Sequence, residues 1–444
     1  MTAAAAAPKT SIARVAMTSL AASSIEWYDF FIYGTAAALV FPKLFFAASL
    51  PPFVAQLAAF STFAVGFIAR PVGGVLFGHF GDLVGRKKAL VTALMLMGLA
   101  TTAVGLLPSY ATAGWISPML LILLRFAQGL AVGGQWGGAV LIATENAPPG
   151  KRGFYGSFAQ MGVPAGVATA NLIFLLMTAN LAPEAFQAWG WRIPFLLSVL
   201  LVGLGLYVHL MLEDTAEFRA LEQAEDKAER RRSPILQALV KHPKEILLGA
   251  GAFVAANGTF YVMITYAVAY ATTTLHVPRT SVLWAVMLGS LISAPFLPLM
   301  AALSDRMGRR GVFMAGALLC GAWSVPFFLL LNSGAFPLIL VAMAVGLTLN
   351  NFMYGPQAAL MTELFSTELR YSGASLGYQL GAIFGGAFAP IISTALYEHY
   401  RSAMAISAYW AVLCGVAFLS VFLLSETNRR AGAGAKAAAK TAQA

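Results

Sequence analysis

"GHFGDLVGRKK" (residues 78–88) is a short charged loop between two long apolar runs, and it returns in altered form as "ALSDRMGRR" at residues 302–310. The two copies place Asp82 and Asp305 in corresponding positions, 223 residues apart. Similarity that returns at a fixed offset is the sequence signature of an internal repeat. This loop therefore predicts that the chain consists of two related halves.

A second pair of loops supports the same division. "TENAPPGKRG" (residues 144–153) corresponds to "TELFSTELRYSG" (residues 362–373). In each copy a glutamate stands seven residues before an arginine, and the two pairs are Glu145 with Arg152 and Glu363 with Arg370. Two motifs that recur at nearly one offset make a chance match a poor explanation.

The composition is that of an integral membrane protein. Of the 444 residues, 59% are hydrophobic and 10% are charged, and the mean hydropathy is +0.76. Soluble domains carry roughly 25% charged residues. Apolar runs of about 20 residues, the length that a helix needs to cross the hydrocarbon core, recur along the chain. We expect twelve transmembrane helices, near residues 16–41, 57–78, 90–107, 118–141, 158–180, 193–212, 247–271, 282–302, 312–331, 337–360, 374–396 and 404–425.

The most hydrophilic stretch, residues 213–246, divides six expected spans from six. The predicted fold class is therefore all-α, with an N-terminal six-helix bundle (1–212), a cytoplasmic linker (213–246) and a C-terminal six-helix bundle with a cytoplasmic tail (247–444). Because six is even, both halves insert in the same orientation and form a parallel repeat. Two such bundles around a central cavity can rock about a midplane site, which is the architecture of a transporter.

The basic residues follow the predicted topology. Of the 28 Lys and Arg residues, we place 22 on the side that holds both termini, four in the opposite loops and two inside spans. Cytoplasmic loops are the ones enriched in Lys and Arg, so both termini are expected in the cytoplasm. Membrane topology explains the net charge of +10, and we predict no nucleic-acid partner.

Sites of other kinds find little support in the sequence. Cys320 and Cys414 stand singly in apolar spans and predict no disulfide. The five histidines show no metal-ligand spacing. No constellation of nucleophile, base and orienting group is evident. We expect neither a metal site nor an enzyme.

Several motifs resemble a known family. "GHFGDLVGRKK" and "SDRMGRR" resemble the signature loops of the major facilitator superfamily. "EWYDFFIYG", "ARPVGGVLFGHFGDLVGRKKAL", "GLAVGGQWGGA" and "WGWRIPF" are similar to its metabolite:proton symporter family, which includes shikimate, 2-oxoglutarate, citrate and proline/betaine carriers. The resemblance implies a multi-pass protein of the bacterial inner membrane that uses the proton gradient. One departure is Gln135, where many relatives carry Glu.

Two carboxylates, Glu26 and Asp29, fall deep inside the first span. Their spacing of three residues puts them on one helix face, and Arg70 in the second span can share their depth. A charge at mid-membrane costs about 2.5–3.5 kcal/mol even on lenient scales. The functional interpretation is that Asp29 carries the proton while Glu26 pairs with Arg70, since burial beside a like charge favours the protonated form of one carboxylate. The alternative is an ion-pair cluster that only locks two helices together.

Arg125 in the fourth span has no acidic residue in the same span. A guanidinium matches a carboxylate in bidentate fashion, so Arg125 predicts an anionic substrate. The alternative is a pair between Arg125 and Glu26 or Asp29. Uncharged polar residues in the spans are expected to form the walls of the substrate cavity: Tyr33, Gln128, Gln135, Gln160, Asn257, Tyr261, Asn350, Asn351, Tyr354, Gln357 and Gln379.

The repeated loops predict a cytoplasmic gate. A carboxylate such as Asp305 can accept hydrogen bonds from a nearby helix N-terminus, and the arginines can bridge to the glutamates. We expect marginal surface ion pairs, because the gate must open in each cycle. The predicted gate residues are Asp82, Arg86, Glu145, Arg152, Asp305, Arg309, Glu363 and Arg370.

The functional hypothesis is proton-coupled uptake of a small organic acid by alternating access. It requires a carboxylate substrate, protons and the lipid bilayer, uses no cofactor besides the proton gradient, and is expected of a monomer. Two alternatives remain open at this point: uptake of a zwitterionic osmolyte, and export of a drug or metabolite by antiport.

Overall fold

The computed structural model describes residues 12–84, 86–133, 147–148, 150–211, 240–365 and 370–426, and within these ranges the chain is helical with no strand. Helices are expected because hydrocarbon offers no partner to a free backbone N–H or C=O. The described helices make twelve consecutive long segments. These are α1 (Ile12–Leu39), α3 (Pro52–Val84), α4 (Arg86–Leu106), α6 (Ile116–Gly133), α8 with α9 (Arg152–Gln160, Gly162–Asn180), α11 (Ile193–Met211), α14 with η2 and α15 (Pro243–Tyr261, Val262–Tyr266, Ala267–Thr273), α16 with α17 (Arg279–Ser293, Phe296–Met307), α18 (Arg309–Asn332), α19 (Phe336–Leu364), α20 with η3 and α21 (Arg370–Ala382, Ile383–Ala387, Ala389–Tyr400) and α22 (Ala403–Leu423).

Short helices join some of these segments. They are α2 (Phe41–Leu44), α5 (Tyr110–Ala113), α10 (Pro183–Ala188) and the 3₁₀ turn η1 (Gly190–Arg192). The all-α fold and the order of the predicted spans are confirmed. Some helices run several residues beyond the predicted ends; the second predicted span, 57–78, becomes α3 at Pro52–Val84, whereas α22 at Ala403–Leu423 ends slightly before the predicted 404–425. Hydropathy detects only the apolar centre of a helix, whereas backbone hydrogen bonding continues past the hydrocarbon core.

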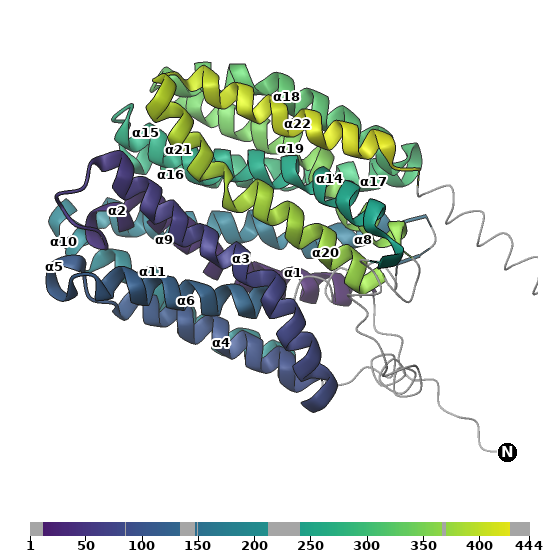
Figure 1. The fold of residues 1–444 in the computed structure, drawn as a ribbon, viewed down its shortest axis with the longest axis horizontal. Coiled ribbons are helices and arrows are strands. Elements are labelled where there is room, and N and C mark those ends of the chain that lie inside the picture. The colour runs from purple at the N-terminus through teal and green to yellow at the C-terminus, as the bar shows by residue number, and fades with distance from the viewer. Residues whose placement is uncertain are drawn as a thin grey trace, which may run out of the picture.

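The long helices fall into two groups (Figure 1). Those from α1 to α11, coloured purple to blue, lie on one side, and those from α14 to α22, coloured teal to yellow, lie on the other. Contacts between the groups include α9 against α16, α8 against α17 and α19, and α3 against η3. We call the end of the molecule at which α17 ends and α18 begins the Asp305 end, and the opposite one the Arg279 end.

The repeat seen in the sequence appears in the helix boundaries. In the second half, α17 ends at Met307 and α18 begins at Arg309, with Gly308 between them at φ 101°. That backbone conformation favours glycine, which has no Cβ. In the first half, α3 ends at Val84 and α4 begins at Arg86. The two breaks fall 223 residues apart, as the sequence offset predicts.

The outer surface is apolar. Large hydrophobic side chains that are more than half exposed include Leu99, Leu123, Leu200, Leu318 and Val412. Nine of the described helices are long and apolar enough to cross a membrane. Exposed apolar area on this scale marks a lipid-facing or partner-facing surface in general. With helices of this length, the chain is a multi-pass membrane protein.

Glycine allows α3 and α6 to approach closely. A Cβ added at Gly129 of α6 would overlap the carbonyl oxygen of Gly66 on α3, and one at Gly133 would overlap that of Arg70. Small residues are the usual means of close helix contact in membranes, because lipid gives no hydrophobic driving force between helices. This contact fixes Arg70 against the neighbouring helix.

We predict that Gly129→Ala lowers the melting temperature of the detergent-solubilised protein. Overpacking of a tight contact costs about 1–3 kcal/mol, and here the neighbouring atoms are backbone that cannot give way. Thermal unfolding followed by fluorescence-detected size exclusion measures the effect. Gly415→Ala is the matched control, since nothing lies within 4 Å of a Cβ there. Equal melting temperatures for the two variants would contradict the interpretation of this contact.

Candidate functional site

A narrow cleft lies between the two groups of helices. It offers about 30 Å³ of room for the centres of water molecules, enough for one or two waters and too little for an organic solute. Its lining residues are Trp27, Val163, Pro164, Ala256, Asn257, Phe260, Tyr261, Ser290, Ser293, Leu297, Leu347, Asn350, Asn351, Tyr354 and Tyr378. Most of them come from the second half, and none of them is charged.

Irregular turns place several of these residues. The eighth segment breaks at Pro295, which has no N–H to donate, directly after Ser293. The seventh segment changes to the π-helical turn η2 directly after Tyr261. Single π-turns inside helices occur frequently at functional sites. The irregular backbone therefore adjoins the cleft.

Five of the predicted cavity residues line this cleft, and they are Asn257, Tyr261, Asn350, Asn351 and Tyr354. The Asn257 amide donates to the Phe253 carbonyl at 3.1 Å, and the Asn351 amide donates to that of Ser293 at 2.8 Å. Asn350 accepts from Thr259 at 3.1 Å. Among the described residues, Asn257 and Asn351 thus use their NH2 groups and Asn350 uses its carbonyl oxygen. The other polar group of each amide has no hydrogen bond to a described residue.

The remaining predicted cavity residues lie elsewhere. Tyr33 donates to the Thr62 hydroxyl at 2.8 Å within the first half. Gln160 donates to the Tyr354 carbonyl at 2.9 Å and Gln379 to that of Gly133 at 3.5 Å, so both join the two halves. Others that are buried outside the cleft lining are Arg125, Gln128 and Gln357, and Gln135 lies outside the described residues.

The sequence did not single out the cleft residues Trp27, Phe260, Ser290, Ser293 and Tyr378. Aromatic and small hydroxyl side chains are common in transmembrane helices, where most of them only pack. The one available signal is the position of Trp27 next to Glu26 in the motif "EWYDFFIYG".

Arg70 lies directly behind the aromatic lining of the cleft. Its guanidinium carbon is 4.4 Å from the ring centres of both Phe30 and Phe67, and 5.8 Å from that of Trp27. The hydroxyl groups of Tyr261 and Tyr378, from the other half, lie near it. Arg70 is 1% exposed, and its Nε and Nη2 have no hydrogen-bond partner among the described residues.

Arg125 occupies a second aromatic cage. Its guanidinium carbon is 4.3 Å from the ring centre of Phe30, 4.2 Å from that of Tyr33 and 4.9 Å from that of Phe63. Nη1 donates to the Gln128 side chain at 3.1 Å, while Nε and Nη2 have no partner. Within the described part of the chain, neither Arg70 nor Arg125 forms an ion pair with a carboxylate. The alternative pairing of Arg125 with Asp29 is absent.

Asp29 faces another direction. It is 1% exposed, both carboxylate oxygens lack a hydrogen-bond partner, and the hydroxyls of Thr101 and Ser198 lie beside it. Asp29 therefore points toward α4 and α11, whereas Trp27 and Phe30 of the same helix face Arg70. Asp29 and Arg70 were expected at a similar depth, but they do not touch, because residues one or two apart on a helix point in different directions. The Glu26 side chain, and with it the predicted pair with Arg70, lies outside the described residues.

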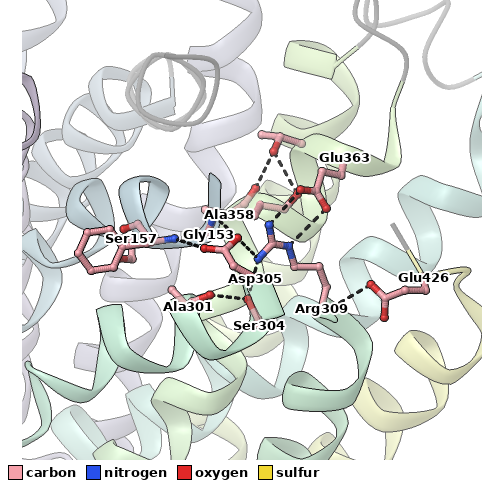
Figure 2. A network of polar contacts seen from close by, with 12 residues as sticks. Gly153, Ser157, Ala301, Ser304, Asp305, Arg309, Ala358, Glu363 and Glu426 are labelled. Carbon is pink, nitrogen blue, oxygen red and sulfur yellow. Dashed lines mark hydrogen bonds and ion pairs between the residues drawn. The ribbon is translucent and has the colours of Figure 1, made fainter. Parts of the chain in front are cut away.

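A polar network closes the Asp305 end (Figure 2). The Asp305 carboxylate accepts from the backbone N–H groups of Gly153 and Phe154, each at 2.9 Å, in the first turn of α8. Arg309 pairs with Asp305 at 2.7 Å and with Glu363 at 3.1 Å. This carboxylate from the second half thus caps a helix of the first half, as the loop motif predicted.

The network differs from the expected surface pairs. The side chains of Arg309 and Asp305 are 1% and 5% exposed. Burial makes their removal one at a time costly, while desolvation keeps the net contribution of the intact pair small. Arg152 forms no ion pair with a described residue, and the predicted partners Asp82, Arg86, Glu145 and Arg370 have side chains outside the described residues.

Glu426 joins the same network and was not expected. Its carboxylate accepts from the backbone N–H of Arg309 at 3.0 Å and from that of Arg310 at 3.2 Å (Figure 2). The first N–H groups of a helix lack partners inside the helix. The residue just beyond α22 therefore caps α18.

The Arg279 end is also closed. The Arg279 guanidinium at the start of α16 lies 5.7 Å from the ring centre of Phe186 in α10, across the two halves. In the centre, Tyr261 of the second half packs on Phe63 and Phe67 of the first, with ring centres 5.6 and 5.2 Å apart. The cleft is therefore enclosed between contacts at both ends.

The sequence matches the Major Facilitator Superfamily over residues 19–376 and again over residues 248–444. The chain belongs to this superfamily. It is thus a transporter and not an enzyme, and the family resemblance of the loops is confirmed. Among the residues that the structure describes, no three His, Cys, Asp or Glu side chains lie together as a metal site.

Curated relatives are similar over nearly the whole chain. The chain is 41% identical over 422 residues to the inner membrane metabolite transport protein YhjE of Escherichia coli (strain K12), covering 94% of this chain and 95% of that one. It is 38% identical over 418 residues to the shikimate transporter of the same strain, with 94% and 95% covered. It is 34% identical over 433 residues to the proline/betaine transporter of Salmonella typhimurium, with 95% and 85% covered.

Solved structures share the fold. A crystal structure of a D-xylose-proton symporter has a TM-score of 0.72 at 18% identity, with 94% of this chain and 98% of that chain covered. A partially occluded inward-open form of the xylose transporter XylE from E. coli gives 0.71 at 16% identity, with 94% and 98% covered. At this identity the likeness concerns the fold alone.

We predict that Asp305→Asn opens the Asp305 end. The variant loses the ionic partner of Arg309 and weakens two charge-assisted hydrogen bonds to α8, so the open population should rise on the order of tenfold. Spin labels at Lys151→Cys and Arg306→Cys, both exposed and in opposite halves, report the separation by pulsed electron resonance. The background carries Cys320→Ala and Cys414→Ala.

Glu398→Gln is the matched control, because Glu398 pairs with Arg401 at the outer end of α21, away from this network. If the distance distribution of Asp305→Asn is as narrow as that of the control, Asp305 does not hold this end closed.

Proposed function

We propose that this protein takes up a small carboxylate metabolite together with protons by alternating access. The observation that carries the proposal is Arg70: a buried guanidinium that has no carboxylate partner among the described side chains and lies directly behind the lining of a closed central cleft. Placing a charge at mid-membrane costs about 2.5–3.5 kcal/mol. A substrate carboxylate is the partner that would offset this cost, and the fork of donors on Arg70 suits it.

We assign Arg70 rather than Arg125 to the substrate because of their positions relative to the cleft. Trp27, Tyr261 and Tyr378 line the cleft and also contact or neighbour Arg70. Arg125 lies behind Phe30 and Tyr33, outside the lining. A small movement of the aromatic side chains brings a bound carboxylate to Arg70, while the amides of Asn257, Asn350 and Asn351 hold uncharged polar groups of the same solute. Because an amide can donate or accept, the contacts of these three asparagines would suit substrates with different polar groups.

Transport requires the cleft to open at one end at a time. The Asp305 network and the Arg279 contact are the groups that must separate, and each joins the two halves. The charge bias of the loops supports an Asp305 end that faces the cytoplasm, with both termini there. The name of the relative YhjE supports the inner membrane as the location.

A zwitterionic osmolyte is the second candidate. The cleft is lined by five aromatic side chains, and aromatic faces attract quaternary ammonium groups: Trp27, Phe260, Tyr261, Tyr354 and Tyr378. One related protein is a proline/betaine transporter. A betaine would still use Arg70 for its carboxylate.

Reconstituted protein in sealed vesicles tests the function. With the outside acidic, radiolabelled hydroxylated carboxylates should accumulate inside above the outer concentration, and an uncoupler should abolish the accumulation. Accumulation of betaine but not of carboxylates would favour the second candidate. Solute loss from preloaded vesicles under the same gradient, with no uptake, would indicate an exporter and overturn the proposal.

We predict that Arg70→Lys raises the KM for the transported carboxylate at least tenfold. Lysine keeps the charge but cannot donate in bidentate fashion, and one lost charge-assisted hydrogen bond is worth about 1.5–3 kcal/mol. Initial rates of uptake measure the effect. Arg401→Lys is the matched control, since Arg401 is exposed, pairs with Glu398 and lies outside the cleft lining. An unchanged KM in Arg70→Lys would remove Arg70 from the substrate site.

We predict that Asp29→Asn abolishes uptake driven by a pH gradient and leaves substrate exchange across the membrane intact. Asparagine keeps the size of the side chain but cannot bind and release a proton, whereas exchange needs no net proton movement. Counterflow at equal pH on both sides measures exchange. Gradient-driven accumulation at the wild-type level in Asp29→Asn would show that another group carries the proton.

A further inference from the structure

A chain of hydrogen bonds leads from Arg125 toward Asp29. Arg125 Nη1 donates to Gln128 Oε1 at 3.1 Å, and Gln128 Nε2 donates to Thr101 Oγ1 at 2.8 Å. Thr101 is fully buried, and its hydroxyl lies beside the Asp29 carboxyl group. The chain crosses from α6 through α4 to α1, all within the first half. It connects a buried cation to a buried acid that do not touch each other.

The series of hydrogen bonds is interrupted between Thr101 and Asp29. The Thr101 hydroxyl donates its single proton to the Met97 carbonyl of its own helix, at 2.8 Å. Within the described part of the chain, both oxygens of Asp29 lack a hydrogen-bond partner, and so does the Ser198 hydroxyl, which also lies beside Asp29. A buried carboxylate that becomes ionised needs donors, and a threonine hydroxyl can rotate from its own helix to supply one.

We propose that Thr101 and Gln128 are positioning residues that transmit the ionisation state of Asp29 to Arg125. When Asp29 releases its proton, the Thr101 hydroxyl turns from the Met97 carbonyl to the carboxylate. Its oxygen lone pairs then turn with it, so Gln128 loses its acceptor and releases Arg125. The guanidinium becomes free to rotate among Phe30, Tyr33 and Phe63, next to the Arg70 site. This inference rests on the proposed function and adds the route of its proton coupling.

The surroundings of Asp29 leave this route open. Among the described side chains of α1, which do not include that of Glu26, the titratable neighbour is Tyr28, whose hydroxyl donates to the Pro194 carbonyl at 2.8 Å. From α4 and α11 the facing polar groups are the hydroxyls of Thr101 and Ser198. Arg70 of α3 and Arg125 of α6 lie against Phe30, on another side of α1. Within the described side chains, the Thr101 hydroxyl is the group that is both near Asp29 and hydrogen-bonded toward an arginine.

The test compares three variants in vesicles. Thr101→Val and Gln128→Leu remove the link while keeping size, and Thr102→Val is the matched control, because the Thr102 hydroxyl bonds only within its own helix, to Gly98 at 2.8 Å. We expect counterflow at equal pH to stay within twofold of wild type in all three. Gradient-driven accumulation should fall at least tenfold in Thr101→Val and Gln128→Leu, and not in Thr102→Val.

Two outcomes would overturn the proposal. One is accumulation at the control level in both link variants. The other is an equal loss of counterflow and accumulation, which marks a structural role. An optical readout is independent of the solute: the infrared band of the protonated Asp29 carboxyl should persist to higher pH in Thr101→Val and stay unchanged in Thr102→Val. If wild-type protein takes up no carboxylate while this band responds as stated, the proposed function fails and the link to Asp29 stands.

Discussion

Two positive charges buried in one half of a membrane protein are the constraint on which the rest depends. Arg70 and Arg125 share the ring of Phe30, with guanidinium carbons 4.4 and 4.3 Å from its centre. Cation–π contacts of this kind contribute about 0.5–2 kcal/mol each. Among the described residues, several guanidinium nitrogens have no hydrogen-bond partner. Aromatic packing shields these charges without neutralising them, and the anion of the proposed function would supply the opposite charge.

The two halves contribute different chemistry to the centre. The first half provides the arginines and Asp29, whereas the second half provides most of the uncharged lining of the cleft. Under the proposed function, a solute would contact the charged groups of the first half and the neutral polar groups of the second, so neither half would form the site alone.

Much of the fold followed from the sequence. The repeated loops predicted that the chain has two related halves. The motif around Asp305 predicted a carboxylate at a helix N-terminus, and the Asp305 carboxylate lies at the first turn of α8. Side-chain neighbours were harder to derive. The spacing of Glu26 and Asp29 defines a helix face but not which helix lies opposite, so the sequence could not place Asp29 beside α4 and α11; the expected pair of Glu26 with Arg70 lies outside the described side chains. The cleft residue Tyr378 carries no signal in the sequence, and Trp27 has only its position in the motif "EWYDFFIYG", because tyrosine and tryptophan serve equally as packing in any transmembrane helix.

The cap that Glu426 places on α18 has a consequence for the end of the chain. The carboxylate reaches back to N–H groups more than a hundred residues earlier, and Arg310 in turn donates to the Val421 carbonyl at 3.1 Å. The start of α18 and the finish of α22 thus brace each other beside Asp305. A protease or a fusion partner that disturbs the segment after Leu423 would therefore affect the Asp305 network without contacting the inside of the bundle.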